Sequence, residues 1–419
     1  MTVIGRVLPA DPLVRSLVVQ SVLSAFGTGT FLTGTAVFFT QIVGLTGAQV
    51  GLGLSISALV TLVLSIPIGR FTDRIGAKKL WIVAAAVEAA LYLSWPLVTG
   101  FALFVGLLTG LAVVEASGMS ARNVYRIAVF PREIRVGALA RMRAARNVGY
   151  TLGAGASGVA LGIGSRTAIL AVPLFTAAVL VVNAVMVSRL PPLPGPTQPA
   201  APSPAEDAVE EVLHPGAPAW RNVGFVVLSF ANGVLSSNQV LLNIVVPLWL
   251  VERTDAPKVL LAWLFGTNTV LAVLLQVRAS RGAETVPGAL RAVRRSGWAF
   301  VISCAVIGIT HDTVGWVSIV LIWAGHITIT GAELWQSASD WGFTSELSDP
   351  RRLGDYQGIW SVGYQIEPIL FPALYTFLAL SWGAPGWIVI AAIGVLAAVV
   401  AHPAARAAER YAVRFTPAG

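Results

Sequence analysis

Four ionisable side chains each lie inside a long apolar stretch of the chain: Glu115, His326, Glu333 and Glu367. On membrane-insertion scales a charged group at the bilayer centre costs about 2.5–3.5 kcal/mol, so such groups persist where they are paired, hydrated or used. A carboxyl group beside apolar walls can load and release a proton near neutral pH. These positions are therefore predicted sites of proton coupling. The structural alternatives are ion pairing with a neighbouring helix and, for His326, hydrogen-bonded packing.

Helical spacing places several of these groups on shared faces. Glu115 and Arg122 are seven residues apart, two turns along one helix. His326, Thr330 and Glu333 follow i, i+4, i+7 spacing and form a stripe. The stripe and the Glu115 face are the two parts of the chain where we expect titratable chemistry.

Uncharged polar side chains mark a candidate substrate path. Asn232, Gln239 and Asn243 recur on one helix face, and Thr33 lies in the first apolar stretch. Tyr364 precedes Glu367 by one turn, in a segment that two prolines are expected to kink. Amides with nearby aromatic rings suit a polar or amphipathic organic substrate better than a simple ion. Hydrogen bonding between helices is the alternative for each residue.

The elements that hold these residues are predicted to be membrane helices. The chain is 56% hydrophobic and 11% charged, whereas soluble domains carry about 25% charged residues. Its long continuously apolar runs favour helices over barrel strands. There is no H-E-x-x-H, G-x-S-x-G or P-loop pattern and a single cysteine, so we predict no enzyme, no cofactor and no cysteine-based metal site.

Twelve spans of about 20 residues can be drawn in the sequence. The first six are Val14–Val43, Ala48–Ile68, Leu80–Val98, Phe101–Val124, Arg146–Ile163 and Ala168–Val187. The second six are Val223–Leu250, Val259–Val277, Ala299–Ile309, Val314–Ala338, Tyr356–Leu380 and Trp387–Val400. The fold class predicted is all-α, with six spans before and six after a central proline-rich segment.

That segment sets the predicted domains. Residues 190–221 contain seven prolines near their start, typical of a stiff extended linker, followed by an acidic stretch at 206–214 that is expected to form a short surface helix. The predicted domains are an N-terminal bundle at 1–189, the cytoplasmic linker at 190–221, a C-terminal bundle at 222–402 and a cytoplasmic tail at 403–419.

Charge distribution predicts the orientation. With the N-terminus in the cytoplasm, the outward loops contain only Arg166, Arg253 and Lys258. The other lysines and arginines lie on the inner side, as the positive-inside rule requires when both termini are cytoplasmic. The net charge of +8 therefore reflects topology and attraction to anionic lipid. It gives no support for nucleic-acid binding.

One polar run links the sequence to a known family. Gly69 to Lys79 reads G-R-F-T-D-R-I-G-A-K-K and is expected to be a tight turn between spans two and three. It resembles the signature loop of the major facilitator superfamily of secondary transporters; the alternative is an ordinary basic loop. The resemblance implies two six-helix bundles that rock around a midplane site. It also implies an inner gate built from Gly69, Asp73, Arg74, Gly76, Lys78 and Lys79, with Asp73 pairing across the two halves.

Span five carries a second resemblance. Gly149, Gly153, Gly155 and Gly158 resemble the glycine-rich stretch of family members that export substrate in exchange for protons. Two landmarks differ: Ala154 replaces the proline of the family's Gly-Pro pair, and Gly106 stands where span four has an arginine. The same glycines match G-x-G-x-x-G, but small residues at this spacing in a membrane helix favour close helix packing.

Residues and resemblance together predict a bacterial, exporter-like secondary transporter. The expected activity is proton-coupled export of a small amphipathic organic molecule by a monomer. The alternatives are import of a small nutrient or metabolite, coupling to another ion, and a sensor of the same fold that does not transport. A composition rich in Ala, Val and Arg and poor in Lys indicates a high-GC bacterial source and hence the inner membrane.

Overall fold

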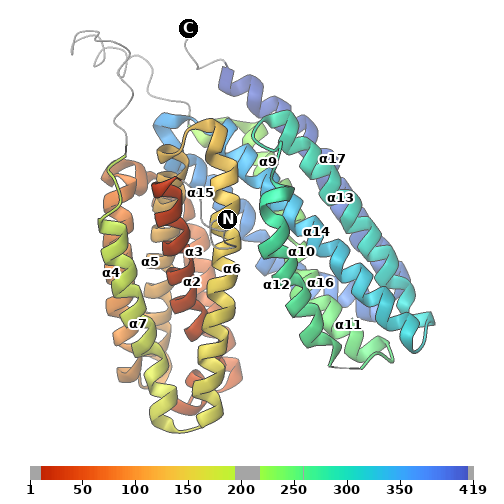
Figure 1. Ribbon diagram of the computed structural model, residues 1–419, viewed down its shortest axis with the longest axis horizontal. Helices are drawn as coiled ribbons and strands as arrows, with labels where there is room; N and C mark the ends of the chain where they lie inside the picture. Colours follow the sequence, from red (N-terminus) through yellow and green to blue (C-terminus); the bar gives the residue numbers. More distant parts are fainter. Residues whose placement is uncertain (1–10, 194–217, 258, 414–419) are drawn as a thin grey trace, which may run out of the picture. The chain divides into compact units, whose positions relative to one another are not determined.

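The computed structural model describes residues 11–193, 218–257 and 259–413, and nearly all of them are helical (Figure 1). This confirms the all-α fold class. The surface helix predicted at 206–214 lies outside the described residues. The chain divides into two compact units. One comprises Met1–Phe130 with Arg141–Thr197, and the other comprises Pro131–Ala140 with Gln198–Gly419.

The first unit is a bundle of long helices. They are α2 (Pro12–Val37) with a π-helical turn at Phe38–Ile42, α3 (Gly47–Ile75), α4 (Ala77–Leu93), α5 (Gly100–Val129), α6 (Arg132–Ile163) from Arg141 onward, and α7 (Arg166–Ser188). Helix α3 packs on α5, α4 packs on α5 and α7, and α2 packs on α7. A cluster of aromatic rings, including Phe31, Phe39, Trp95 and Phe104, fills one end of this bundle.

The second unit repeats this pairing scheme with shorter pieces. Its helices are α9 (Val223–Leu235), α10 (Asn238–Val240), a π-helical turn at Leu241–Val245, α11 (Val246–Arg253), α12 (Leu260–Ala279), α13 (Val286–Gly308), α14 (Trp316–Leu347), α15 (Leu353–Tyr364), α16 (Ile366–Trp382) and α17 (Ala384–Val413). Short 3-10 turns occupy Ala219–Arg221, Ile309–Asp312 and Pro350–Arg352 in this unit and Trp95–Leu97 in the first. Helix α12 packs on α14, α13 on α14 and α17, and α9 on α17. Each unit thus builds the same helix-to-helix contacts in the same chain order.

Eight helical runs in the described part of the chain are long and apolar enough to cross a membrane. The other predicted spans correspond to α2, α6, α12 and the α15–α16 pair. Helix α6 differs because five arginines occupy its first half, and α15 and α16 are individually short. The twelve predicted spans therefore map onto six helical runs in each unit.

The tight turn predicted at Gly69–Lys79 is wrong, because the chain there is almost entirely helical. Helix α3 continues through Arg74 to Ile75, and α4 begins at Ala77. Only Gly76 breaks the helix, with a φ of 91° that favours glycine. Its N–H still donates to the Thr72 carbonyl at 3.0 Å. A single residue therefore reverses the chain, and the cations lie on helix ends rather than on a loop.

Other boundaries also differ from those expected. Helix α6 begins at Arg132 rather than Arg146, α13 begins at Val286 rather than near Ala299, and α17 continues to Val413 into the predicted tail. Arginine and polar residues are compatible with helix once it leaves the hydrocarbon. Composition therefore locates the membrane crossing and misses the helical extension beyond it.

Two predicted spans are broken in the second unit. The seventh is interrupted at Ser236–Ser237 between α9 and α10, and the eleventh at Gln365 between α15 and α16. Pro368 has no N–H to donate to the carbonyl of Tyr364. The first helix therefore ends at Tyr364, and the next begins at Ile366. The break lies one turn earlier than the kink expected at the prolines.

A short polar contact fixes the loop between α11 and α12. Asp255 accepts hydrogen bonds from the Gly315 backbone N–H and the Ser318 hydroxyl. These bonds, the backbone bond from Gly315 first, hold the pKa of Asp255 below its ordinary value of 3.8. Because the folded-state pKa is depressed, the contact stabilises the fold above pH about 3.8 and is lost as the pH falls through the folded pKa. The Asp255→Asn variant should therefore have a lower melting temperature than wild type at pH 7, and the gap should narrow as the pH falls below 3.8. A gap that did not narrow on acidification would contradict this assignment.

Candidate functional site

A cavity of about 60 Å³ lies within the first unit, enclosed by α2, α4, α5, α6 and α7. Its walls carry four charged side chains: Glu88 from α4, Glu115 and Arg122 from α5, and Arg146 from α6. Trp81, Tyr150, Ser24, Thr28 and Asn183 complete the polar and aromatic lining. Helical spacing explains the arrangement, since Trp81 and Glu88, and Glu115 and Arg122, are two turns apart.

Three of the four charged groups at this cavity have no short polar contact with the described part of the chain. Glu88, Glu115 and Arg122 make no hydrogen bond or ion pair with any described residue. The Nε of Arg122 is buried and has no hydrogen-bond partner. Glu115 is exposed to solvent at the cavity, whereas Glu88 is half-buried. The predicted Glu115–Arg122 face is therefore brought together with two further charges, on α4 and α6.

A neighbouring arginine has a structural role. Arg126 is 7% exposed and donates through Nη2 to the Ser21 hydroxyl at 2.9 Å and to Gln20 Oε1 at 3.3 Å. Gln20 in turn donates to Asn183 at 2.8 Å. The guanidinium carbon of Arg126 lies 6.0 Å from the centre of the Trp81 ring. These bonds tie α5 to α2 and α7 behind the cavity.

The second unit holds a polar network on α14. Glu333 is 5% exposed, and Asn268 of α12 donates to its Oε2 at 3.0 Å. The same amide contacts the Thr330 hydroxyl at 3.2 Å. His326 is 3% exposed and lies one turn before Thr330 on the same face. Its backbone carbonyl accepts a hydrogen bond from the Thr330 hydroxyl at 2.8 Å. The predicted stripe of His326, Thr330 and Glu333 is therefore buried against α12.

Gln336 extends the polar surface toward two other helices. Its amide donates to Asn232 Oδ1 of α9 and to the Tyr364 hydroxyl of α15, each at 3.1 Å. Two predicted path residues thus meet at one amide. Gln239 and Asn243 do not join them: Asn243 is exposed and donates back to the carbonyl and side chain of Gln239.

The remaining predicted residues are placed separately. Glu367 is half-buried at the start of α16 and makes no hydrogen bond or ion pair with a described residue. Thr33 lies on α2 in a stretch whose side chains are outside the described set. At the predicted gate Gly69 is buried, Asp73, Arg74 and Lys79 are exposed, and Lys78 is half-buried. The pairing expected for Asp73 stays a prediction.

The four glycines of α6 fall into two pairs. A side chain at Gly149 or Gly153 would overlap the backbone of α2, at the carbonyls of Val22 and Phe26 respectively. At Gly155 and Gly158 an added Cβ would meet nothing within 4 Å. Close helix packing is therefore confined to Gly149 and Gly153.

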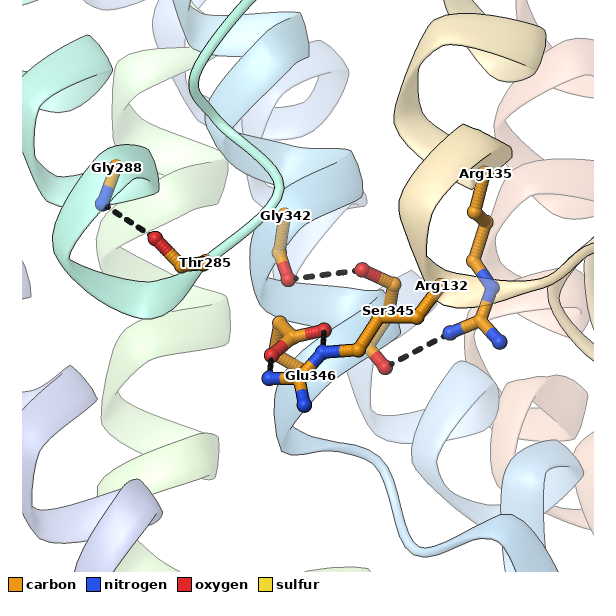
Figure 2. A network of polar contacts seen from close by, with 7 residues as sticks. All are labelled: Arg132, Arg135, Thr285, Gly288, Gly342, Ser345 and Glu346. Atoms are coloured by element: carbon orange, nitrogen blue, oxygen red, sulfur yellow. Dashed lines mark hydrogen bonds and ion pairs between the residues drawn. The ribbon is translucent and has the colours of Figure 1, made fainter.

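An ion pair joins the start of α6 to the end of α14 within the second unit. Figure 2 shows the Arg132 guanidinium lying against the Glu346 carboxylate, with two nitrogens on its two oxygens. Arg135 donates to the Ser345 carbonyl at 3.2 Å. Burial, with Arg132 nearby, lowers the pKa of Arg135. Because α6 continues into the first unit from Arg141, this contact lies where the chain passes from one unit to the other.

Breaking this pair should cost stability that a double-mutant cycle can isolate. The Glu346 side chain is 5% exposed and that of Arg132 is 65% exposed, so we expect a coupling free energy of about 1–2 kcal/mol, between exposed and buried pairs. Glu346→Gln, Arg132→Gln and the double variant would be compared by thermal unfolding. Glu133→Gln, at an exposed acid one residue along, is the matched control. Additive single effects would contradict the predicted coupling.

The sequence patterns did not assign a role to Glu88, Asn268, Gln336 or Glu346. Gln336 could have been found, since it follows Glu333 by three residues on the same helix face. The other three depend on contacts between distant helices, which helical spacing within one span does not reveal.

Comparisons with known proteins agree on the fold. A family model described as the Major Facilitator Superfamily matches residues 17–339. The structure resembles a bacterial homologue of the iron transporter ferroportin in the outward-facing state, with TM-score 0.71 and 13% identity over 94% of this chain and 100% of that one. It also resembles the proton:xylose symporter XylE, with TM-score 0.69 and 15% identity over 92% and 94% of the two chains.

The human organic anion transporter MFSD10 is a third similar structure, with TM-score 0.65 and 15% identity over 94% of this chain and 100% of that one. A search of curated proteins found no match. Identities this low carry the fold alone, whereas the family model spans most of the sequence. With six helical runs in each unit and eight of them able to cross a membrane, the chain belongs to the major facilitator superfamily and is a secondary transporter rather than an enzyme.

Proposed function

We propose that this transporter exports a small amphipathic organic molecule in exchange for protons, across a bacterial inner membrane and with both termini in the cytoplasm. The observation that carries the proposal is Glu333, a carboxyl group 5% exposed within an apolar helix and hydrogen-bonded by the neutral amide of Asn268. An amide can serve both the charged and the protonated form of the acid, since it donates to one and accepts from the other.

Protonation of Glu333 would change the free energy of the buried network. The ionised form carries the cost of charge in a low-dielectric interior, and the protonated form does not. A proton therefore acts as a ligand that shifts the balance between conformations of different hydration. Alternating access by two bundles couples that shift to the movement of substrate.

Other observations support export and an organic substrate. The glycine-rich face of α6 resembles that of exporters, and amides and aromatic rings line the polar surface around Gln336. MFSD10 is named an organic anion transporter. Import is the second candidate, because XylE and FucP are named proton symporters of xylose and fucose.

Direction and substrate can be tested in cells. The small molecules in medium and cytoplasm would be compared between cells expressing wild type, the Glu333→Gln, Glu367→Gln double variant, or no transporter. We expect a compound that accumulates outside only with wild type. A compound enriched inside would establish import instead.

Expression and membrane insertion must match for this comparison to count. Glu252→Gln, at an exposed acid of α11, is the control for removing a carboxylate from the same unit. Identical profiles for all cells at equal expression would contradict transport and favour a sensor of the same fold.

A further inference from the structure

The cavity in the first unit is lined by two acidic and two basic side chains. Two carboxylates, Glu88 and Glu115, face two guanidiniums, Arg122 and Arg146, from three different helices. Opposite charges around one small cavity would be expected to close into ion pairs, because a charge partly withdrawn from water, such as that of half-buried Glu88, is costly without a partner. Instead Glu88, Glu115 and Arg122 make no hydrogen bond or ion pair with a described residue. Both signs of charge thus line one small space.

Neighbouring side chains contact two guanidiniums in and near the cavity. Arg126, which could otherwise neutralise an acid, is occupied by Gln20 and Ser21. The Arg146 guanidinium carbon lies 5.9 Å from the centre of the Tyr150 ring, one turn along α6, which holds it at the wall. No described cation other than Arg122 and Arg146 lines the cavity. A molecule that enters therefore meets carboxylates and guanidiniums together.

Size limits what can enter. A volume of about 60 Å³ is enough for a few water molecules, since a cavity needs about 10–15 Å³ to hold one. Sites that enclose a whole drug-sized ligand measure about 300–1,000 Å³. The cavity can thus accept two small polar groups while the rest of a larger molecule stays outside it. The two groups that match its walls are an ammonium and a carboxylate.

We infer that this cavity binds the zwitterionic head group of the transported molecule, the ammonium against Glu88 and Glu115 and the carboxylate against Arg122 and Arg146. The substrate class is then an amphipathic zwitterion, such as an α-amino acid with an apolar side chain. Trp81 and Tyr150 supply aromatic surface beside the head group. This inference rests on the proposed function and adds the chemistry of its substrate.

Three probes that share one apolar body test the inference on the full-length protein in detergent. They are L-phenylalanine, 2-phenylethylamine, which lacks the carboxylate, and 3-phenylpropionate, which lacks the ammonium. Binding would be measured by calorimetry at pH 7. We expect the zwitterion to bind at least about tenfold more tightly than either partner, since charged hydrogen bonds are each worth about 1.5–3 kcal/mol. Equal affinities, or no binding by any probe, would overturn the inference.

Variants then test the ammonium contact and the carboxylate contact separately. Glu115→Gln should weaken the binding of L-phenylalanine and 2-phenylethylamine and leave that of 3-phenylpropionate unchanged. Arg122→Gln should weaken the binding of L-phenylalanine and 3-phenylpropionate and leave that of 2-phenylethylamine unchanged. Glu252→Gln should change none of them. The probe ranking within wild type needs no variant, so a misfolded variant does not decide the outcome. Proton-driven export that persists without zwitterion binding would reject this inference alone. Zwitterion binding without proton-coupled transport would reject the proposed function alone.

Discussion

Replacing Glu333 with glutamine is expected to lower proton-driven accumulation of the transported compound by about 100-fold. An ionised carboxylate in the bilayer costs about 2.5–3.5 kcal/mol, and every 1.4 kcal/mol corresponds to a factor of ten. Glutamine is neutral in every state and still hydrogen-bonds to Asn268, so the network remains while the proton loses its effect. The measurement is uptake of the exported compound into inverted membrane vesicles under an imposed pH difference.

Two controls separate coupling from structural damage. Glu333→Asp keeps the titratable group and should retain part of the accumulation, and Glu252→Gln should behave as wild type. Exchange of labelled for unlabelled compound without a gradient should continue in Glu333→Gln, because it needs no net proton movement. If Glu333→Gln accumulated the compound as wild type does, coupling would have to be reassigned, with Glu367 or Glu115 next.

Replacing Gly153 with leucine is expected to destabilise the first unit severely. The added Cβ would lie 2.7 Å from the backbone nitrogen of Thr30 and would overlap the Phe26 carbonyl. Overpacking against side chains typically costs about 1–3 kcal/mol, and a helix backbone yields less than a side chain does. We expect a loss of at least about 3 kcal/mol, visible as a collapse of the monodisperse fraction in size-exclusion chromatography.

Gly158→Leu is the matched control, since it makes the same change one to two turns along α6. An added Cβ there meets no atom within 4 Å, and leucine is about 0.8 kcal/mol better than glycine in a helix. This variant should be as stable as wild type or slightly more so. Equal damage from both substitutions would show that leucine in α6, rather than contact with α2, is responsible.

The membrane class and the two-times-six order of helices could be read from the sequence. Apolar runs of about 20 residues indicate where the backbone crosses the hydrocarbon core of the bilayer. A helix is the element that satisfies its own backbone hydrogen bonds there. The ends of those helices could not be read. Arg132–Ala145 and Arg70–Ile75 are too polar to signal a span, yet they continue as helix in water.

Candidate groups were also predictable, and their partners were not. An acid inside an apolar run is conspicuous, so Glu115, Glu333 and Glu367 are evident from the sequence. Whether such an acid meets an amide, a guanidinium or open space depends on which helices pack together. Asn268 reaches Glu333 from 65 residues away, and no local pattern specifies that contact.

The sequence alone determined that this protein lives in a membrane, belongs with secondary transporters and carries titratable groups within its helices. The membrane setting and the titratable positions follow from hydropathy and helical periodicity, which act over a few turns. The transporter assignment follows from the resemblance carried by the run from Gly69 to Lys79. Tertiary structure alone decided that Glu88 joins Glu115 at one cavity with two arginines, that Gly153 contacts α2 and Gly158 does not, and that Arg132 meets Glu346. These depend on the rotation of each helix about its axis, which is set by the packing of side chains far apart in the chain.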